Sequence, residues 1–126
     1  MLLRNYRDDN SLDVDINIRT HDIATLGLWG PQAEAALGNF VDPNAINLEN
    51  FPFVTAKNLT LNLSEGKTID VWATRISYVG ESGWEIYLNN NSEEGLALYD
   101  SLLKVGVVPV GIAVSYTHLR AHETIL

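Results

Sequence analysis

Alternation of apolar and polar residues is the clearest pattern in this chain, and it predicts strands. Residues 12–20 alternate with period two, which is typical of a strand with one face toward solvent. Similar alternation recurs at residues 54–63, and a nearly continuous apolar run follows residue 106. We therefore expect additional strands at residues 23–28, 54–63, 68–79, 84–88 and 107–113.

Two helices are expected between these strands. Pro31 suits the first turn of a helix over residues 31–40, and its apolar stripe consists of Ala33, Ala36, Leu37 and Phe40. Asp42-Pro43-Asn44 then has the composition of a loop. Ser92 is a favourable N-cap for a second helix, which Gly106 closes. The expected apolar stripe of this second helix is Leu96, Tyr99, Leu102 and Leu103.

These elements define the expected fold class. After the leading strand their order is β-α-β-β-β-α-β, with short strands and no internal repeat. This order predicts an α+β domain whose mixed or antiparallel sheet carries two helices, close to a split βαβ (ferredoxin-like) arrangement.

Composition narrows the classes of partner. The chain has 126 residues, with 8 Lys+Arg against 16 Asp+Glu, so its formal net charge is −8. This acidic balance argues against a nucleic-acid partner, and the lack of cysteine excludes disulfides and thiolate metal ligands. No run reaches the roughly 18 apolar residues of a membrane span. We therefore expect a cytoplasmic domain with neither nucleic acid nor a membrane as partner.

The last thirteen residues differ from the rest of the chain. Residues 114–124 resemble one translated reading frame of a transposase-type sequencing adapter. We therefore expect a partial domain over 1–113 and a non-native tail over 114–126, with the authentic protein continuing beyond Ala113. His118 and His122, with Glu123 beside them, have the spacing of a zinc motif, but we assign no metal site to an adapter sequence.

The stretch from Arg75 to Tyr87 carries the candidate chemistry. A four-residue loop at 80–83 would pair Val79 with Trp84, placing Tyr78 opposite Glu85 and Ile76 opposite Tyr87. Alternation then separates two faces of the hairpin. One face packs on the core and holds Ser77, Val79, Trp84, Ile86 and Leu88, with Arg75 at its far end in no assigned role; the other holds Tyr78, Glu85 and Tyr87.

A carboxylate between two tyrosines suits a flat, nitrogen-rich heterocycle. The two carboxylate oxygens match adjacent N–H donors, and the phenols add stacking surface. The alternative from the residues alone is a solvated cross-strand cluster. Trp84 is expected to be a core anchor, Glu81 a solvated turn residue, and His21 a loop histidine without a catalytic role.

Three motifs, in this order, carry a family resemblance. They are Leu28-Trp29-Gly30-Pro31-Gln32-Ala33, Phe51-Pro52-Phe53, and the stretch over residues 75–87. Together they resemble the folate-binding aminomethyltransferase family, which includes the glycine cleavage T-protein, over about residues 13–113. The first and third motifs are most similar to the folate domain of dimethylglycine and sarcosine dehydrogenase-like flavoproteins.

The resemblance implies a function. In that family the position of Glu85 binds the pterin of tetrahydrofolate, and in the dehydrogenase branch the positions of Tyr78, Ile86 and Tyr87 also line the folate. The implied product is 5,10-methylene-tetrahydrofolate, formed from a methylated-amine or aminomethyl substrate. The family's catalytic aspartate has no counterpart here, so we assign no catalytic residue and expect this fragment to bind folate weakly, if at all, and to have no turnover.

The resemblance leaves three alternatives open. In a flavoprotein, FAD would occupy an upstream domain that is not in this sequence. A stand-alone aminomethyltransferase would instead work with a lipoyl carrier protein. The third alternative is a non-catalytic relative that uses the same fold for regulation or binding.

Overall fold

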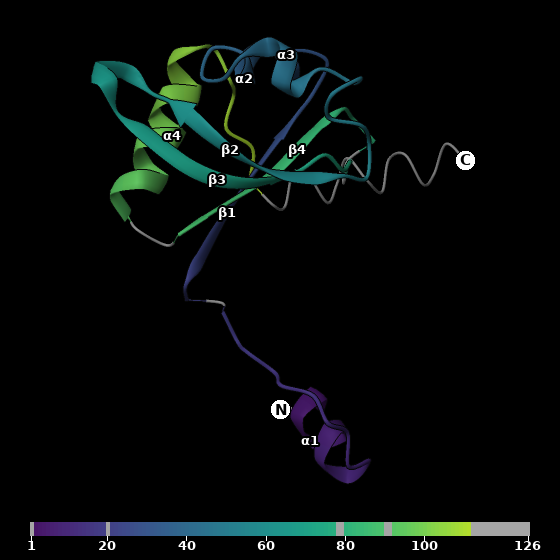
Figure 1. The fold of residues 1–126 in the computed structure, drawn as a ribbon. Coiled ribbons are helices and arrows are strands. Elements are labelled where there is room, and N and C mark those ends of the chain that lie inside the picture. The colour runs from purple at the N-terminus through teal and green to yellow at the C-terminus, as the bar shows by residue number, and fades with distance from the viewer. Residues whose placement is uncertain (1, 20, 78–79, 90–91, 112–126) are drawn as a thin grey trace.

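The computed structural model describes residues 2–19, 21–77, 80–89 and 92–111 (Figure 1). Its helices and strands follow in chain order: α1 (Leu2–Asp9), β1 (Ile23–Trp29), α2 (Ala33–Leu37), α3 (Pro43–Ile46), β2 (Ala56–Asn62), the 3-10 turn η1 (Ser64–Gly66), β3 (Thr68–Thr74), β4 (Gly83–Asn89) and α4 (Ser92–Lys104). The predicted α+β class is confirmed.

The strands form one antiparallel sheet in the order β1-β4-β3-β2. The hairpin β2–β3 is joined to β4, and β1 then pairs with β4 along its whole length, from Ile23↔Asn89 to Trp29↔Gly83. Of the final strand expected at 107–113, residues 107–111 are irregular, and residues 112–113 lie outside the described residues. The described strands thus contain no parallel pair, and the split βαβ arrangement is not completed among them.

The hydrophobic core lies between one face of the sheet and three helices. Alternate strand residues point into it, because successive side chains of a strand face opposite sides. Leu37 of α2, Ile46 of α3, and Leu98 and Leu102 of α4 cover them. The buried strand residues are Leu28, Leu59, Leu61, Ile69, Val71, Ala73, Trp84, Ile86 and Leu88. The predicted role of Trp84 as core anchor is confirmed, since its side chain is fully buried.

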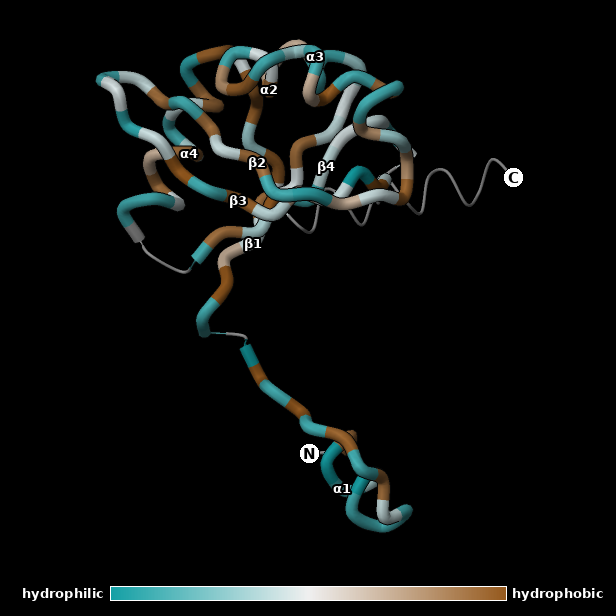
Figure 2. Tube along the Cα trace, viewed as in Figure 1, coloured by the Kyte–Doolittle hydropathy of each residue, from teal (hydrophilic) through white to brown (hydrophobic). Residues whose placement is uncertain are grey.

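The N-terminal segment lies apart from this body. The strand predicted over 12–20 is wrong for residues 12–19, which link α1 to β1 as irregular backbone (Figure 1). Their apolar and polar residues do alternate, as Figure 2 shows. A segment with such alternation forms a strand, however, only where a neighbouring strand satisfies its backbone hydrogen bonds. Here the first strand, β1, begins only at Ile23. Neither α1 nor this link buries a side chain in the core.

The helices deviate from expectation in several places: α1 was not predicted, and α2 covers only Ala33–Leu37 of the expected 31–40. Asp42 caps a short helix, α3, where a loop was predicted, by accepting a hydrogen bond from the Asn44 backbone N–H at 3.0 Å. In α4, Leu98 and Leu102 are buried while Leu96, Tyr99 and Leu103 are exposed, so most of the predicted stripe is wrong. The helix carries apolar residues on more than one side, and packing on the sheet selects the 98–102 side.

The end of α4 is as predicted. Gly106 adopts a positive φ of 96°, and the Val107 N–H donates to the Leu102 carbonyl at 3.1 Å. The expected capping by Ser92 lies outside the described side chains. Among the described residues, no helix has the length and apolar character to cross a bilayer.

Candidate functional site

Glu85 and Tyr87 lie side by side on the outer face of β4, opposite to the core. Both are partly exposed, and the Tyr87 hydroxyl donates a hydrogen bond to Oε2 of Glu85. Their cross-strand neighbours are Gly27 and Thr74 for Glu85, and Thr25 and Trp72 for Tyr87. The shared face predicted for Glu85 and Tyr87 is therefore present.

The predicted hairpin register is wrong. Glu85 lies opposite Thr74, and Tyr87 opposite Trp72, so β3 ends at Thr74 and residues 75–82 connect it to β4. Arg75 directly follows β3: its backbone N–H donates to the Thr55 carbonyl at 2.9 Å, which continues the β2–β3 pairing by one residue, and its side chain is buried in the core. The connection over residues 75–82 is thus longer than the four-residue loop at 80–83 that the glycines suggested.

The other sequence-derived site residues are placed differently. The side chain of Ile86 is fully buried in the core, on the face away from Glu85 and Tyr87. Tyr78 and Val79 lie outside the described residues. Ser77 is exposed rather than packed on the core.

Trp29 is a neighbour of Glu85 that the sequence placed in a family motif without assigning it a role in the site. Its six-membered ring occupies the space above Gly27, where a Cβ would lie 2.2 Å from Cζ3. Because Gly27 is directly opposite Glu85, the indole lies where the cross-strand partner of Glu85 would have its side chain. The indole N–H donates to the Ile76 carbonyl at 3.2 Å. The signal available in the sequence was a glycine inside a predicted strand, which often marks a close approach of neighbouring atoms.

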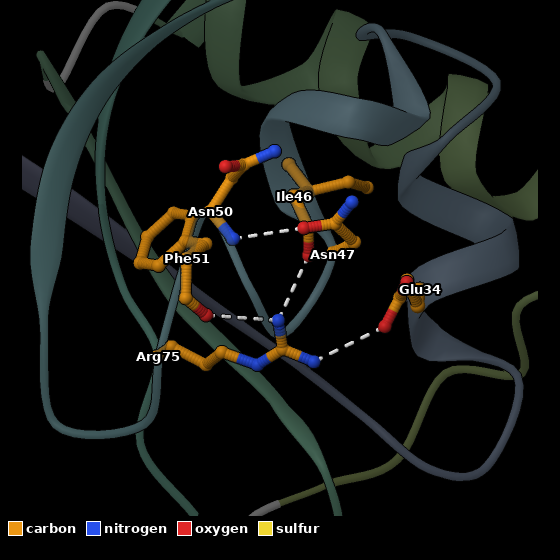
Figure 3. Close-up of polar contacts among 6 residues, drawn as sticks. All are labelled: Glu34, Ile46, Asn47, Asn50, Phe51 and Arg75. Carbon is orange, nitrogen blue, oxygen red and sulfur yellow. Dashed lines mark hydrogen bonds and ion pairs between the residues drawn. The ribbon is translucent and has the colours of Figure 1, made fainter.

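Arg75 is a buried cation that joins separate parts of the chain (Figure 3). Its Nη1 donates to the carbonyl oxygens of Ile46 at 2.8 Å and Phe51 at 3.0 Å, and its Nη2 is 3.1 Å from Oε2 of Glu34. Sequence reasoning gave Arg75 no role. In the structure it fixes α2, the loop after α3 and the start of the 75–82 connection to one another.

Aromatic rings complete this cluster. The Arg75 guanidinium lies 4.6 Å from the ring centroid of Trp84 and 5.3 Å from that of Phe53. Phe51 meets Trp84 edge-on, with centroids 6.1 Å apart. In β1, Leu28 and Trp29 pair with Trp84 and Gly83. The three motifs are thus brought together around β4, directly beneath the face that carries Glu85.

Comparison with known proteins decides the family. Residues 1–123 match the family described as the GCVT N-terminal domain. The chain belongs to the glycine cleavage T-protein family. The resemblance predicted from the three motifs is therefore confirmed. The proposed boundary at Ala113 stays a prediction, because the match runs past it and residues 112–126 lie outside those described.

Two named relatives show which members of the T-protein family the chain is similar to. It is 36% identical over 94 residues to "Dimethylglycine dehydrogenase, mitochondrial" of Homo sapiens, covering 75% of the chain and 10% of that protein. It is 31% identical over 100 residues to "Aminomethyltransferase" of Herpetosiphon aurantiacus, covering 79% of the chain and 25% of that protein. The chain spans a tenth to a quarter of the length of these relatives.

Within the described residues of this T-protein domain, no group of three or more His, Asp or Glu side chains could hold a metal ion. His118, His122 and Glu123 lie outside the described residues.

The Tyr87–Glu85 hydrogen bond gives a prediction about pH. That bond, with burial and the nearby carboxylate charge, raises the pKa of Tyr87 above its ordinary value. The folded state then holds the phenolic proton more tightly than the unfolded state. The resulting stabilisation is present below the ordinary tyrosine pKa and is lost as the pH rises through the raised pKa.

We therefore expect the free energy of unfolding to fall above about pH 10, and to fall less steeply in Tyr87→Phe. Urea titrations over that range measure this, with Tyr99→Phe as the control because Tyr99 lies on α4, away from Glu85. Identical pH curves for Tyr87→Phe and the unaltered chain would show that the hydrogen bond adds no stability.

Proposed function

We propose that this chain is the pterin-binding part of a tetrahydrofolate-dependent one-carbon enzyme, and that Glu85 holds the heterocycle. The observation that carries this proposal is the partly exposed Glu85 carboxylate on the outer face of β4, oriented by the Tyr87 hydroxyl and flanked by the Trp29 indole. Membership of the T-protein family supports the same ligand class.

The donor set fits an amino-pyrimidinone edge. Each carboxylate oxygen has two lone pairs, so Oε2 of Glu85 can accept from Tyr87 and still accept from a ligand, while Oε1 stays available. Two parallel N–H donors of a pterin would meet both oxygens, which gives orientation as well as affinity. Tyr87 keeps its proton at neutral pH and so remains a donor that fixes the carboxylate rotamer.

Two further residues take supporting roles in this proposal. Ile86 is buried beneath the strand, so it would hold Glu85 and Tyr87 in position from the core side rather than contact the ligand with its side chain. Tyr78 is retained on the family resemblance alone. No residue of this chain is assigned as catalytic.

The contribution to chemistry is positioning. Bound tetrahydrofolate would supply the nitrogen that accepts a one-carbon unit, giving 5,10-methylene-tetrahydrofolate. The chain's own part is to hold the pterin by Glu85 so that this nitrogen faces the substrate, a proximity effect. The aminomethyl or methylated-amine substrate would bind in other parts of the proposed full-length enzyme.

Sequence identity favours a dehydrogenase-like full-length protein, called the parent here, over a stand-alone transferase. The identity is 36% to the dimethylglycine dehydrogenase and 31% to the aminomethyltransferase. The proposed parent would then carry FAD on another domain. A stand-alone transferase would instead depend on a lipoyl carrier protein.

Glu85→Gln tests the proposal. We expect the ¹⁵N-labelled 126-residue chain to bind 5-formyltetrahydrofolate in the millimolar range, seen as shifts of β4 amide signals. Glu85→Gln should weaken this binding at least about tenfold, because it removes charge-assisted hydrogen bonds of about 1.5–3 kcal/mol. Glu49→Gln, at an exposed carboxylate after α3, is the control. No shifts with the unaltered chain, or equal shifts in Glu85→Gln, would contradict the proposal.

A further inference from the structure

A shallow pocket continues the candidate site along the sheet. Its volume is about 220 Å³, and Tyr87 forms part of its wall. Trp72 of β3 lies directly opposite Tyr87 in the strand register and is 45% exposed. The polar and aromatic residues that line it are Arg19, Asn58, Asp70, Trp72, Tyr87 and Asn89.

The surroundings of Trp72 suit a flat ring. An indole on the outer face of a sheet presents its apolar surface to water unless something covers it, and aromatic rings favour offset-stacked or edge-to-face partners. Tyr87 lies on one side of it and Asn58 on the other in the strand register. An aromatic surface with a few polar groups at its rim is the usual lining of a small-molecule site.

The rim does not favour an anion, because Arg19 pairs with Asp22 and Asp70 keeps its negative charge. Arg19 lies 3.7 Å from the carboxylate of Asp22. Asp70 accepts a hydrogen bond from the Thr60 hydroxyl at 2.6 Å. Ring stacking on Trp72 is therefore the main interaction that the pocket offers.

The pocket and Glu85 form one continuous strip. Tyr87 is two residues along β4 from Glu85, a rise of about 7 Å, and its hydroxyl reaches back to the Glu85 carboxylate. A ligand made of two linked flat rings would place one ring at Glu85 and the next over Trp72.

We propose that Trp72 is a binding residue for the second aromatic ring of the ligand whose heterocycle Glu85 holds. This inference rests on the proposed function and adds to it a two-ring site in which Trp72 and Tyr87 form the second subsite. For a folate, the second ring is the aminobenzoyl group.

Two probes separate the subsites: 5-formyltetrahydrofolate, which has both rings, and 6-methyltetrahydropterin, which lacks the second. In the ¹⁵N-labelled chain we expect the Trp72 indole N–H signal, assigned from Trp72→Phe, to shift with the first probe and not with the second. Trp72→Leu should weaken the two-ring probe about two- to tenfold, the range of aromatic pair energies. Its affinity for the pterin should be unchanged. Tyr99→Leu, at an exposed aromatic residue of α4, is the control.

The outcomes are distinguishable. If both probes bind and Glu85→Gln weakens both, but neither the Trp72 signal nor the Trp72→Leu affinity changes, the second subsite is wrong while the proposed function stands. If neither probe binds the unaltered chain, the proposed function and this inference both fall. Equal losses for both probes in Trp72→Leu would show a general structural effect and would also overturn the subsite.

Discussion

Replacing Arg75 with methionine is expected to destabilise the domain by about 2–4 kcal/mol, because two buried carbonyl groups lose their charged donor at about 1–3 kcal/mol each. Methionine fills much of the volume but donates no hydrogen bond. The carbonyls of Ile46 and Phe51 would then remain inside the protein without their charged donor, and the cation beneath Trp84 would be lost. Stabilities of small domains are about 5–15 kcal/mol, so this loss removes a large part of the total.

The matched variant is Glu34→Gln. Glu34 is the ionic partner of Arg75, but its side chain is 46% exposed and water can replace much of the interaction. We expect a loss of at most about 1 kcal/mol. Urea denaturation followed by tryptophan fluorescence compares the two variants. Equal midpoints for Arg75→Met and the unaltered chain would mean that the cluster in Figure 3 does not hold the loops together.

Gly83→Ala is expected to cost about 3 kcal/mol, at the upper end of overpacking effects. A Cβ at this position would lie 1.9 Å from the Leu28 carbonyl oxygen and 2.8 Å from the Trp29 Cα. These are backbone atoms of the neighbouring strand, and they can move only if β1 separates from the end of β4. The alanine would therefore open the sheet where the first and third motifs meet.

Gly27→Ala provides the comparison. Its Cβ would also overlap, at 2.2 Å, but with ring atoms of Trp29 rather than with backbone. The indole can rotate away, so we expect a loss of about 1 kcal/mol and a change in the environment of Trp29. Thermal unfolding gives the two stabilities. A larger loss for Gly27→Ala than for Gly83→Ala would contradict this account of the β1–β4 contact.

The strands near the site could be predicted from alternation, but their register could not. The position of β2 follows from a period-two pattern, β1 and β4 were also predicted as strands, and strand alternation gave the shared face of Glu85 and Tyr87. The chain leaves β3 at Arg75, whose side chain forms hydrogen bonds with residues 24 to 41 positions away. A local pattern carries no information about such partners, so the glycines at 80 and 83 suggested too short a loop.

Residues that act through neighbouring strands were missed for a similar reason. Gly27 and Trp29 gain meaning only once β1 is known to pair with β4, because the indole fills the space opposite Glu85. In the sequence, Trp72 was only one residue of a predicted strand. The pocket beside it forms only because Tyr87 of β4 lies opposite it. The strand predicted at 12–19 was wrong for the opposite reason. Apolar and polar residues do alternate there, but no described strand pairs with this segment.

The sheet order has a consequence for how the molecule reaches its native state. Strands β2, β3 and β4 follow one another and pair through local connections, whereas β1 pairs with β4 across an intervening stretch, as in Gly27↔Glu85. Joining distant segments carries the larger loop-closure entropy, so we expect β1 to dock late in folding. Substitutions that weaken this docking should then accelerate unfolding more than they slow folding. The surroundings of Glu85 would be the last part of the sheet to assemble and the first to open.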